Sequence, residues 1–221
     1  MDNNENVVSV STESRRRARS ILGVCGSAHI VHDGFHDSLY ILLPLWSQAF
    51  GLSLVQVGML KFVYSGAMAV FQMPAGFLAE RYSARLLLAA GTVIVALAFL
   101  ALGLAGGFGT LLVLMFFAGL GSGPQHPISA TLVAKAYETG PRRAAIGIYN
   151  FSGDIGKVVF PAVLALTAGA VGWRTGVIGM GVFGVIAAVV ILVILTRLKA
   201  GSRSKPQPDP VYLQGLTPLR G

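Results

Sequence analysis

The stretch from Ala28 to Pro44, AHIVHDGFHDSLYILLP, determines how the rest of the sequence is interpreted. It places three histidines and two aspartates inside a longer apolar segment, residues 21–46, which has the length of a membrane-spanning helix. At about 100° per residue, all five ionisable side chains fall within an arc of about 140°. They are His29, His32, Asp33, His36 and Asp37. Ionisable groups at membrane depth are costly unless they face a bundle interior, a partner or water, so this stripe predicts a functional lining.

The composition indicates a membrane protein with several spans. Of the 221 residues, 54% are hydrophobic and only 12% are charged, whereas charged residues make up about a quarter of a soluble domain. Apolar runs of spanning length occur at 21–46, 54–79, 86–106, 109–134, 144–171 and 174–197. The sequence therefore predicts an all-α membrane protein with six transmembrane helices.

The basic residues indicate topology rather than nucleic-acid binding, although the net charge is +8. They gather at 15–19, 81–85, 135–143 and 197–205, on alternate connections between the apolar runs, and only Arg174 breaks this pattern. Basic loops stay on the cytoplasmic side, so both termini are expected there, in the plasma membrane of a bacterium (the inner membrane). We expect residues 1–20 to form a disordered cytoplasmic tail, 21–198 the six-helix domain, and 199–221 a flexible cytoplasmic tail.

Two later segments also carry polar groups where lipid is expected. His126 lies in GLGSGPQHPIS between two prolines that interrupt the helix; it either lines a substrate pocket or makes a structural hydrogen bond. In YNFSGDIGKVVFP, the side chains of Asn150, Asp154 and Lys157 share one helix face. Asp154 and Lys157 either form a local ion pair, or Lys157 faces the charged stripe across a central cavity. Lys61 is expected at a solvated helix end.

The stripe suits proton exchange, because imidazole titrates near neutral pH and an aspartate beside it can share the proton. We expect the proton-coupling residues to be Asp33, His29 and Asp37, with either aspartate as the proton carrier. The expected substrate-binding residues are His32, His36, His126, Asn150, Asp154 and Lys157. Histidines spaced i,i+4 also suit metal ligation, but no third ligand of known geometry accompanies them. No metal and no cofactor are therefore expected.

The connection GFLAERYSAR, residues 76–85, resembles the signature loop between the second and third helices of the major facilitator superfamily, G-x-L-a-D-R-x-G-R-[RK]. Gly76, Leu78, Arg81 and Arg85 match, Glu80 replaces the acid, and the residues at 83 and 84 depart from the pattern. GDIGKVVFP, residues 153–161, is similar to the glycine-proline motif of that family's fifth helix. The resemblance implies that Gly76, Glu80, Arg81 and Arg85 form a gating loop, which holds two six-helix halves together on the cytoplasmic side.

Within that superfamily, the pattern His29-x-x-x-Asp33, with the later His126-Pro127, looks like the fosmidomycin-resistance group of drug exporters. This resemblance implies a secondary active transporter that works by alternating access, in which Asp33 is the best candidate for the proton site. We expect an antiporter that exports a small polar or amphipathic solute in exchange for protons.

Six spans make up only the first half of an ordinary twelve-span member. A homodimer, a separate second half or an inactive truncated product would each account for this. Alternative functions are a non-transporting assembly or sensor subunit and, less favoured, a metal-ion transporter or an intramembrane enzyme. A rhomboid-type protease needs G-x-S-G followed by a histidine, whereas GLGSG is out of frame and no histidine follows His126. The expected partners are therefore a small solute, protons, the lipid bilayer and a second six-helix unit.

Overall fold

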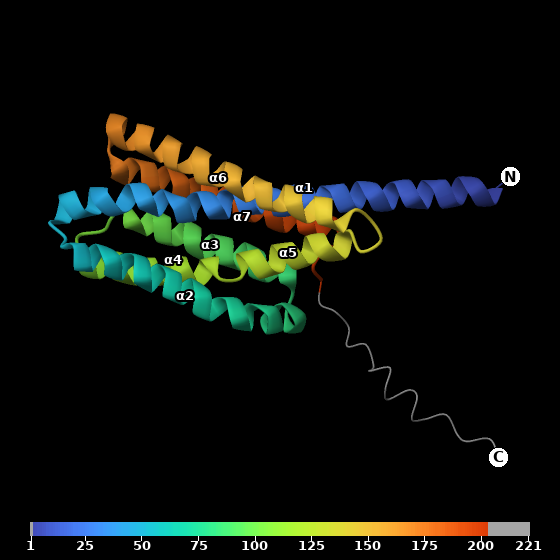
Figure 1. The fold of residues 1–221 in the computed structure, drawn as a ribbon, viewed down its shortest axis with the longest axis horizontal. Helices are drawn as coiled ribbons and strands as arrows, with labels where there is room; N and C mark the ends of the chain where they lie inside the picture. The colour runs from blue at the N-terminus through green and yellow to red at the C-terminus, as the bar shows by residue number, and fades with distance from the viewer. Residues whose placement is uncertain (1, 203–221) are drawn as a thin grey trace, which may run out of the picture.

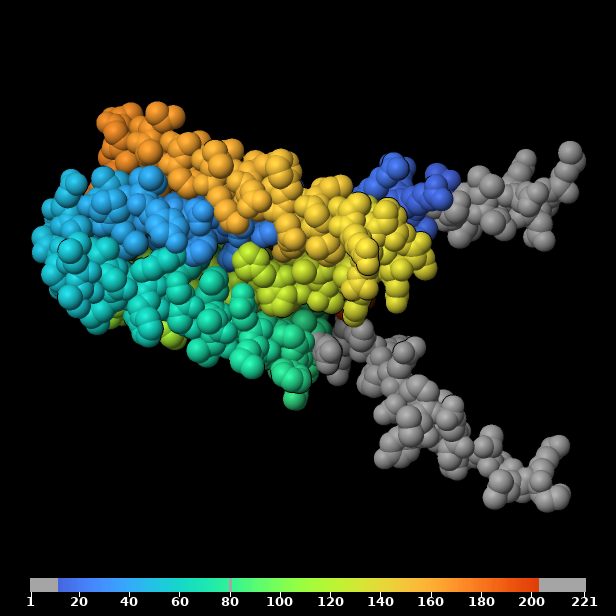
Figure 2. Space-filling model, in the orientation of Figure 1, coloured from blue at the N-terminus to red at the C-terminus, as the bar shows by residue number. Residues whose placement is uncertain are grey.

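The computed structural model describes the backbone of residues 2–202, and side chains from residue 12 onward except that of Glu80. Within residues 2–202 every regular element is an α-helix. The helices are α1 (Asp2–Phe50), α2 (Leu54–Arg81), α3 (Ala84–Leu102), α4 (Phe108–Ser122), α5 (Gln125–Ala136), α6 (Arg142–Val171) and α7 (Trp173–Arg197). They lie roughly along one direction and form an elongated bundle (Figure 1). The space-filling view shows α6, α1 and α2 side by side along one face of this bundle (Figure 2).

Five segments of the described chain are long and apolar enough to cross a membrane: Leu54–Ala79, Ala84–Leu102, Phe108–Ala136, Arg142–Val171 and Trp173–Arg197. The third of these joins α4 and α5 into one crossing. The remaining long helix, α1, runs beside α6 through the bundle, and its histidines and aspartates reduce its hydropathy. The predicted all-α fold with six transmembrane helices is confirmed.

The interruption between α4 and α5 falls at Gly123 and Pro124, inside the segment where the sequence predicts a broken helix. The Gly123 amide still donates to the carbonyl of Gly119, which ends α4 with a helical hydrogen bond. Proline lacks an amide hydrogen, so the backbone cannot continue the same ladder. The break leaves His126 in the first turn of α5, at the middle of this crossing.

The apolar core has two parts along the bundle. One contains Phe35, Trp46, Phe99 and Met115 with their neighbours, and the other contains Cys25, Leu88 and Val133 with theirs. The helices α1 and α6 approach closely because Gly156 has no side chain: a Cβ there would overlap the carbonyl oxygen of Ile30. The polar stripe of α1 lies at this close contact.

The structure differs from the expectation for the N-terminal segment. Residues 2–20 continue α1 as helix, whereas the sequence analysis predicts a disordered tail over 1–20. No glycine or proline occurs between residues 2 and 22 to end the helix. The Arg17 guanidinium holds this extension against the end of α7, because Nε donates to Leu198 O at 2.9 Å and Nη2 to Lys199 O at 3.3 Å. The expectation for residues 203–221 lies outside the described residues.

The segment that follows α7 folds back onto the connection between α2 and α3. The hydroxyl of Ser83 donates to Gly201 O at 2.7 Å, and the amide of Arg85 donates to the same oxygen at 3.3 Å. Gly201 has φ +63°, a conformation that favours glycine. We call residues 198–202 the C-terminal clasp, because they bind both the start of the bundle and this connection.

Candidate functional site

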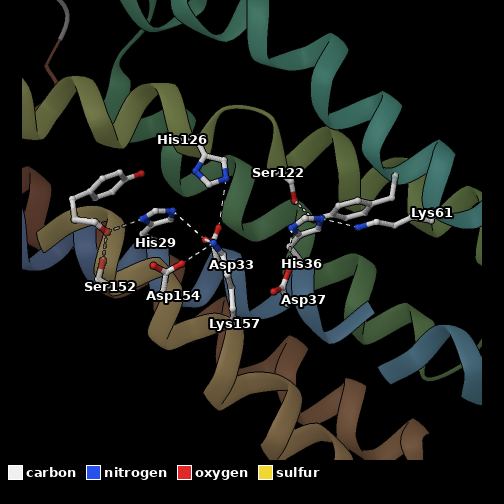
Figure 3. Close-up of polar contacts among 12 residues, drawn as sticks. His29, Asp33, His36, Asp37, Lys61, Ser122, His126, Ser152, Asp154 and Lys157 are labelled. Carbon is white, nitrogen blue, oxygen red and sulfur yellow. Dashed lines mark hydrogen bonds and ion pairs between the residues drawn. The ribbon is translucent and has the colours of Figure 1, made fainter. Parts of the chain in front are cut away.

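The centre of the site is the carboxylate of Asp33, which is only 3% exposed. Three side chains from three helices surround it: His29 on α1, His126 on α5 and Lys157 on α6 (Figure 3). His29 Nε2 lies 3.3 Å from Oδ2, Lys157 Nζ lies 3.4 Å from Oδ2, and His126 Nε2 lies 3.5 Å from Oδ1. One buried acid therefore links three separate elements of the bundle.

The ring of His29 is held in one orientation by Tyr149 on α6. His29 Nδ1 lies 2.9 Å from the Tyr149 carbonyl oxygen, and since that oxygen only accepts, Nδ1 carries the hydrogen. The two rings are stacked with their centroids 4.2 Å apart. Nε2 of His29 is thereby directed at Asp33. The sequence analysis missed Tyr149; its only signal was its place one helical turn before Gly153 in the glycine-proline motif.

Gly153 on α6 makes room for this pair. A Cβ at this position would lie 2.6 Å from Asp33 Oδ2 and 2.8 Å from His29 Nε2. Any side chain on α6 at this level would displace the carboxylate or the imidazole. The glycine of the GDIGK segment therefore has a role at the site, in addition to the helix packing provided by Gly156.

Lys157 satisfies both interpretations of the Asp154–Lys157 pair. Its ammonium donates to Asp154 Oδ1 at 2.9 Å, as a local ion pair would, and also faces Asp33 on the charged stripe. Asp154 and Lys157 keep side-chain exposures of 63% and 42%, and His126 keeps 37%. Asn150 lies on the same helix and is exposed. These groups form the open side of the Asp33 site.

His29, Asp33 and His126 offer three ligand atoms that lie within 4.8 Å of one another, a spacing that also suits a metal ion. The ammonium of Lys157, however, already lies against the same carboxylate and supplies the opposite charge. An ion-pair network therefore accounts for this arrangement without a bound ion.

A second polar group lies farther along α1, toward its C-terminal end. Lys61 Nζ on α2 donates to His36 Nε2 at 2.8 Å, and His36 Nδ1 lies 3.4 Å from Asp37 Oδ1. The His36 ring stacks on that of Tyr64 with centroids 5.3 Å apart. The Tyr64 hydroxyl is in turn 2.8 Å from Ser122 Oγ (Figure 3). The expectation of a solvated Lys61 was wrong, because this side chain turns inward onto His36.

His32 occupies a different environment from the other members of the stripe. It is only 4% exposed, and its ring stands edge-on to that of His126 with centroids 5.0 Å apart. Among the described residues, none hydrogen-bonds to His32 Nε2. His32 is therefore buried behind His126 rather than placed on the open side of the site.

The proposed gating loop lies where α2 ends and α3 begins. Gly76 is within α2, Arg81 is its last residue, and Arg85 is in the first turn of α3. The side chain of Glu80 lies outside the described residues. The departure from the family pattern at Ser83 has a structural reason, since this buried side chain binds the C-terminal clasp. The gating role of these residues stays a prediction.

Comparison with known proteins identifies the family of this chain. The sequence profile described as Major Facilitator Superfamily matches residues 26–220, most of the chain. The chain belongs to the major facilitator superfamily. Membership of this superfamily, together with the apolar helices, makes it an integral membrane protein of a transporter family.

Curated members of the superfamily resemble the chain over most of its length. The fosmidomycin resistance protein of Escherichia coli is 27% identical over 187 residues, which are 85% of this chain and 45% of that protein. The probable L-galactonate transporter of Escherichia coli is 26% identical over 185 residues, 84% of this chain and 41% of that protein. The chain thus spans less than half the length of these relatives.

Solved structures of the superfamily share the fold. A peptide transporter POT in complex with sulfate superimposes with a TM-score of 0.74 at 18% identity, covering 91% of this chain and 46% of that one. A bacterial homologue of the human lysosomal transporter Spinster, inward-facing and occupied, gives a TM-score of 0.68 at 19% identity, covering 91% and 47%. These matches confirm that the helices form one half of a major facilitator bundle.

Proposed function

We propose that the chain is one six-helix unit of a secondary active transporter, which exports a small polar or amphipathic solute in exchange for protons by alternating access. One observation carries this proposal: Asp33, buried in the middle of the bundle, is contacted at once by groups from α1, α5 and α6. An ionised carboxylate at membrane depth is energetically costly, so its presence there favours a functional role.

The proposed coupling follows from what a proton would do to these contacts. With Asp33 ionised, Lys157 bridges α6 to α1, because its ammonium touches both Asp33 and Asp154. Protonation of Asp33 removes that attraction and leaves Lys157 paired with Asp154, on its own helix. Proton occupancy would therefore change the relative stability of two packings of α1 against α6, which is what a coupled transition needs.

The open side of the site supports a second unit. Groups on that side are exposed at spanning depth, as described for His126, Asp154 and Lys157. Charged side chains at this depth need a partner, a cavity or water rather than lipid. We propose that a second copy, related by an axis along the membrane normal, or a separate six-helix half completes the cavity. Both termini would be cytoplasmic, in a bacterial inner membrane.

Export is supported by the likeness to the fosmidomycin resistance protein. A small polar solute is supported by relatives named as transporters of L-galactonate and of hexuronate. Fosmidomycin and D-glucuronate are accordingly the first two solutes to assay.

The test is pH-gradient-driven flux of these two solutes in proteoliposomes that contain the full chain. Asp33→Asn should abolish that flux without changing expression, because the amide keeps the shape of the side chain but cannot ionise. Glu138→Gln is the control, since it also removes a single carboxylate charge, at an exposed position in the connection between α5 and α6, and should retain most of the flux. Undiminished flux in Asp33→Asn would refute the assignment of the proton site.

Native mass spectrometry of the gently extracted chain addresses the partner. A dimer is the expected result for a unit that completes its own cavity. A strictly monomeric chain would refute the homodimer and leave the separate second half as the proposed partner.

A further inference from the structure

No opposite charge from the described side chains contacts the ammonium of Lys61. No carboxylate of a described side chain lies within 4.0 Å of its Nζ, although this side chain is half-buried inside a spanning segment. Lys157, by contrast, contacts two carboxylates. Of these two lysines inside the bundle, one is neutralised and the other remains available to an anion.

The groups around Lys61 leave its other hydrogens free to bind a ligand. An ammonium has three N–H donors, and among the described side chains one of them is used by His36 Nε2 at 2.8 Å. Because Nε2 accepts this bond, Nδ1 of His36 carries a hydrogen and is directed toward Asp37 at 3.4 Å. The rings of Tyr40 and Tyr64 lie 4.7 Å and 5.6 Å from Nζ and form aromatic walls. Tyr40 is 58% exposed, so the group is open on that side.

The frame of this group is fixed before any ligand arrives. Tyr64 is fully buried, its hydroxyl is 2.8 Å from Ser122 Oγ on α4, and the His36 ring lies almost parallel to it at 8°. Since α1, α2 and α4 all contribute, the ammonium is held between rigid helices rather than on a loop. Such preorganisation lowers the entropy lost when a ligand binds.

We propose that His36, Tyr40 and Lys61 form a subsite for the anionic group of the transported solute, a carboxylate, phosphonate or sulfonate. The inference rests on the proposed transport function and specifies the charge of its substrate. The anion would bind about one to two helical turns along α1 from Asp33, because His36 and Tyr40 follow Asp33 by three and seven residues. Proton and anion would then occupy neighbouring positions on the same helix.

The test measures the local preference for anions without requiring transport. The substitution Tyr40→Cys is introduced into the full chain as the reporter thiol. The native Cys25 is fully buried, so the reagents should not label it. Two methanethiosulfonate reagents are compared in proteoliposomes, one with a sulfonate and one with a trimethylammonium group. The sulfonate reagent should label the thiol introduced at position 40 about tenfold faster, relative to a small thiol in solution, because the Lys61 ammonium lies 4.7 Å from the centre of the ring that this thiol replaces.

Lys61→Met in the same background should reduce this preference to about onefold, and Lys61→Arg, which keeps the charge, should retain it. Equal labelling by both reagents with Lys61 present, or an unchanged preference in Lys61→Met, would overturn the subsite. If the methionine variant does not fold, loss of the preference with Lys61→Gln decides the question. The labelling result is independent of Asp33→Asn, so failure of the subsite and failure of proton coupling are distinguishable.

Discussion

Gly153→Ala is predicted to disrupt the Asp33 site by adding a single methyl group. That methyl would lie 2.6 Å from Asp33 Oδ2, and ordinary contact begins at 3.4 Å, so the carboxylate must move by about 0.8 Å. A shift of that size away from α6 would lengthen the Lys157 contact from 3.4 Å toward the 4.0 Å limit of an ion pair or beyond. Proton-driven flux should therefore fall strongly.

A matched control separates the steric cost of the added methyl group from the accompanying gain in helix propensity. Overpacking typically costs about 1–3 kcal/mol, whereas glycine to alanine inside a helix stabilises by about 1 kcal/mol. Gly147 lies on the same helix α6, and apart from its own stretch of helix no atom of the described residues lies within 4 Å of the place that an added methyl group would take. Gly147→Ala should therefore show only the gain in helix propensity. The difference between the two variants isolates the steric cost at the site.

Thermal unfolding in detergent measures this difference. Each kcal/mol corresponds to about 2–4 °C for a chain of this size. Gly153→Ala should melt at least about 2 °C below Gly147→Ala and lose flux, while Gly147→Ala should transport normally. Equal melting temperatures and equal flux in both variants would refute the reasoning that Gly153 provides space for the Asp33 and His29 pair.

Two further predictions concern packing. Gly156→Ala should destabilise the chain by about 3 kcal/mol, because its methyl would meet the backbone carbonyl of Ile30, which cannot rotate away; wild-type thermal stability in this variant would contradict the close α1–α6 contact. Tyr64→Phe should cost about 1 kcal/mol through loss of the buried bond to Ser122, visible as a lower melting temperature. Tyr40→Phe, at an exposed ring, should leave that temperature unchanged.

The helical repeat was enough to predict the Asp33 side of the site. Residues spaced three and four apart share a face, so the stripe on α1 and the pair of Asp154 and Lys157 could be found from spacing alone. That Lys157 also meets Asp33 depends on how α6 is placed against α1, which the sequence analysis treated as one of two alternatives. In the structure, Lys157 contacts both Asp33 and Asp154.

Contacts that depend on the register between helices could not be predicted in the same way. Lys61 is close to the N-terminal end of α2, where long side chains usually reach water. Its inward turn follows from the position of His36 on a neighbouring helix. The carbonyl of Tyr149 is equally invisible in the sequence, since every residue has one. The helical N-terminal extension was missed because its polar composition resembles that of a disordered segment.

The C-terminal clasp determines where the polypeptide leaves the bundle. Gly201 is hydrogen-bonded to Ser83 and Arg85, so the described part of the chain ends at Ser202, beside the α2–α3 connection. A tether that joined this end to another six-helix unit would therefore start beside the connection proposed as a gating loop. Traction along such a tether would act directly on that connection, and the length of the tether would limit how far two such units could separate there.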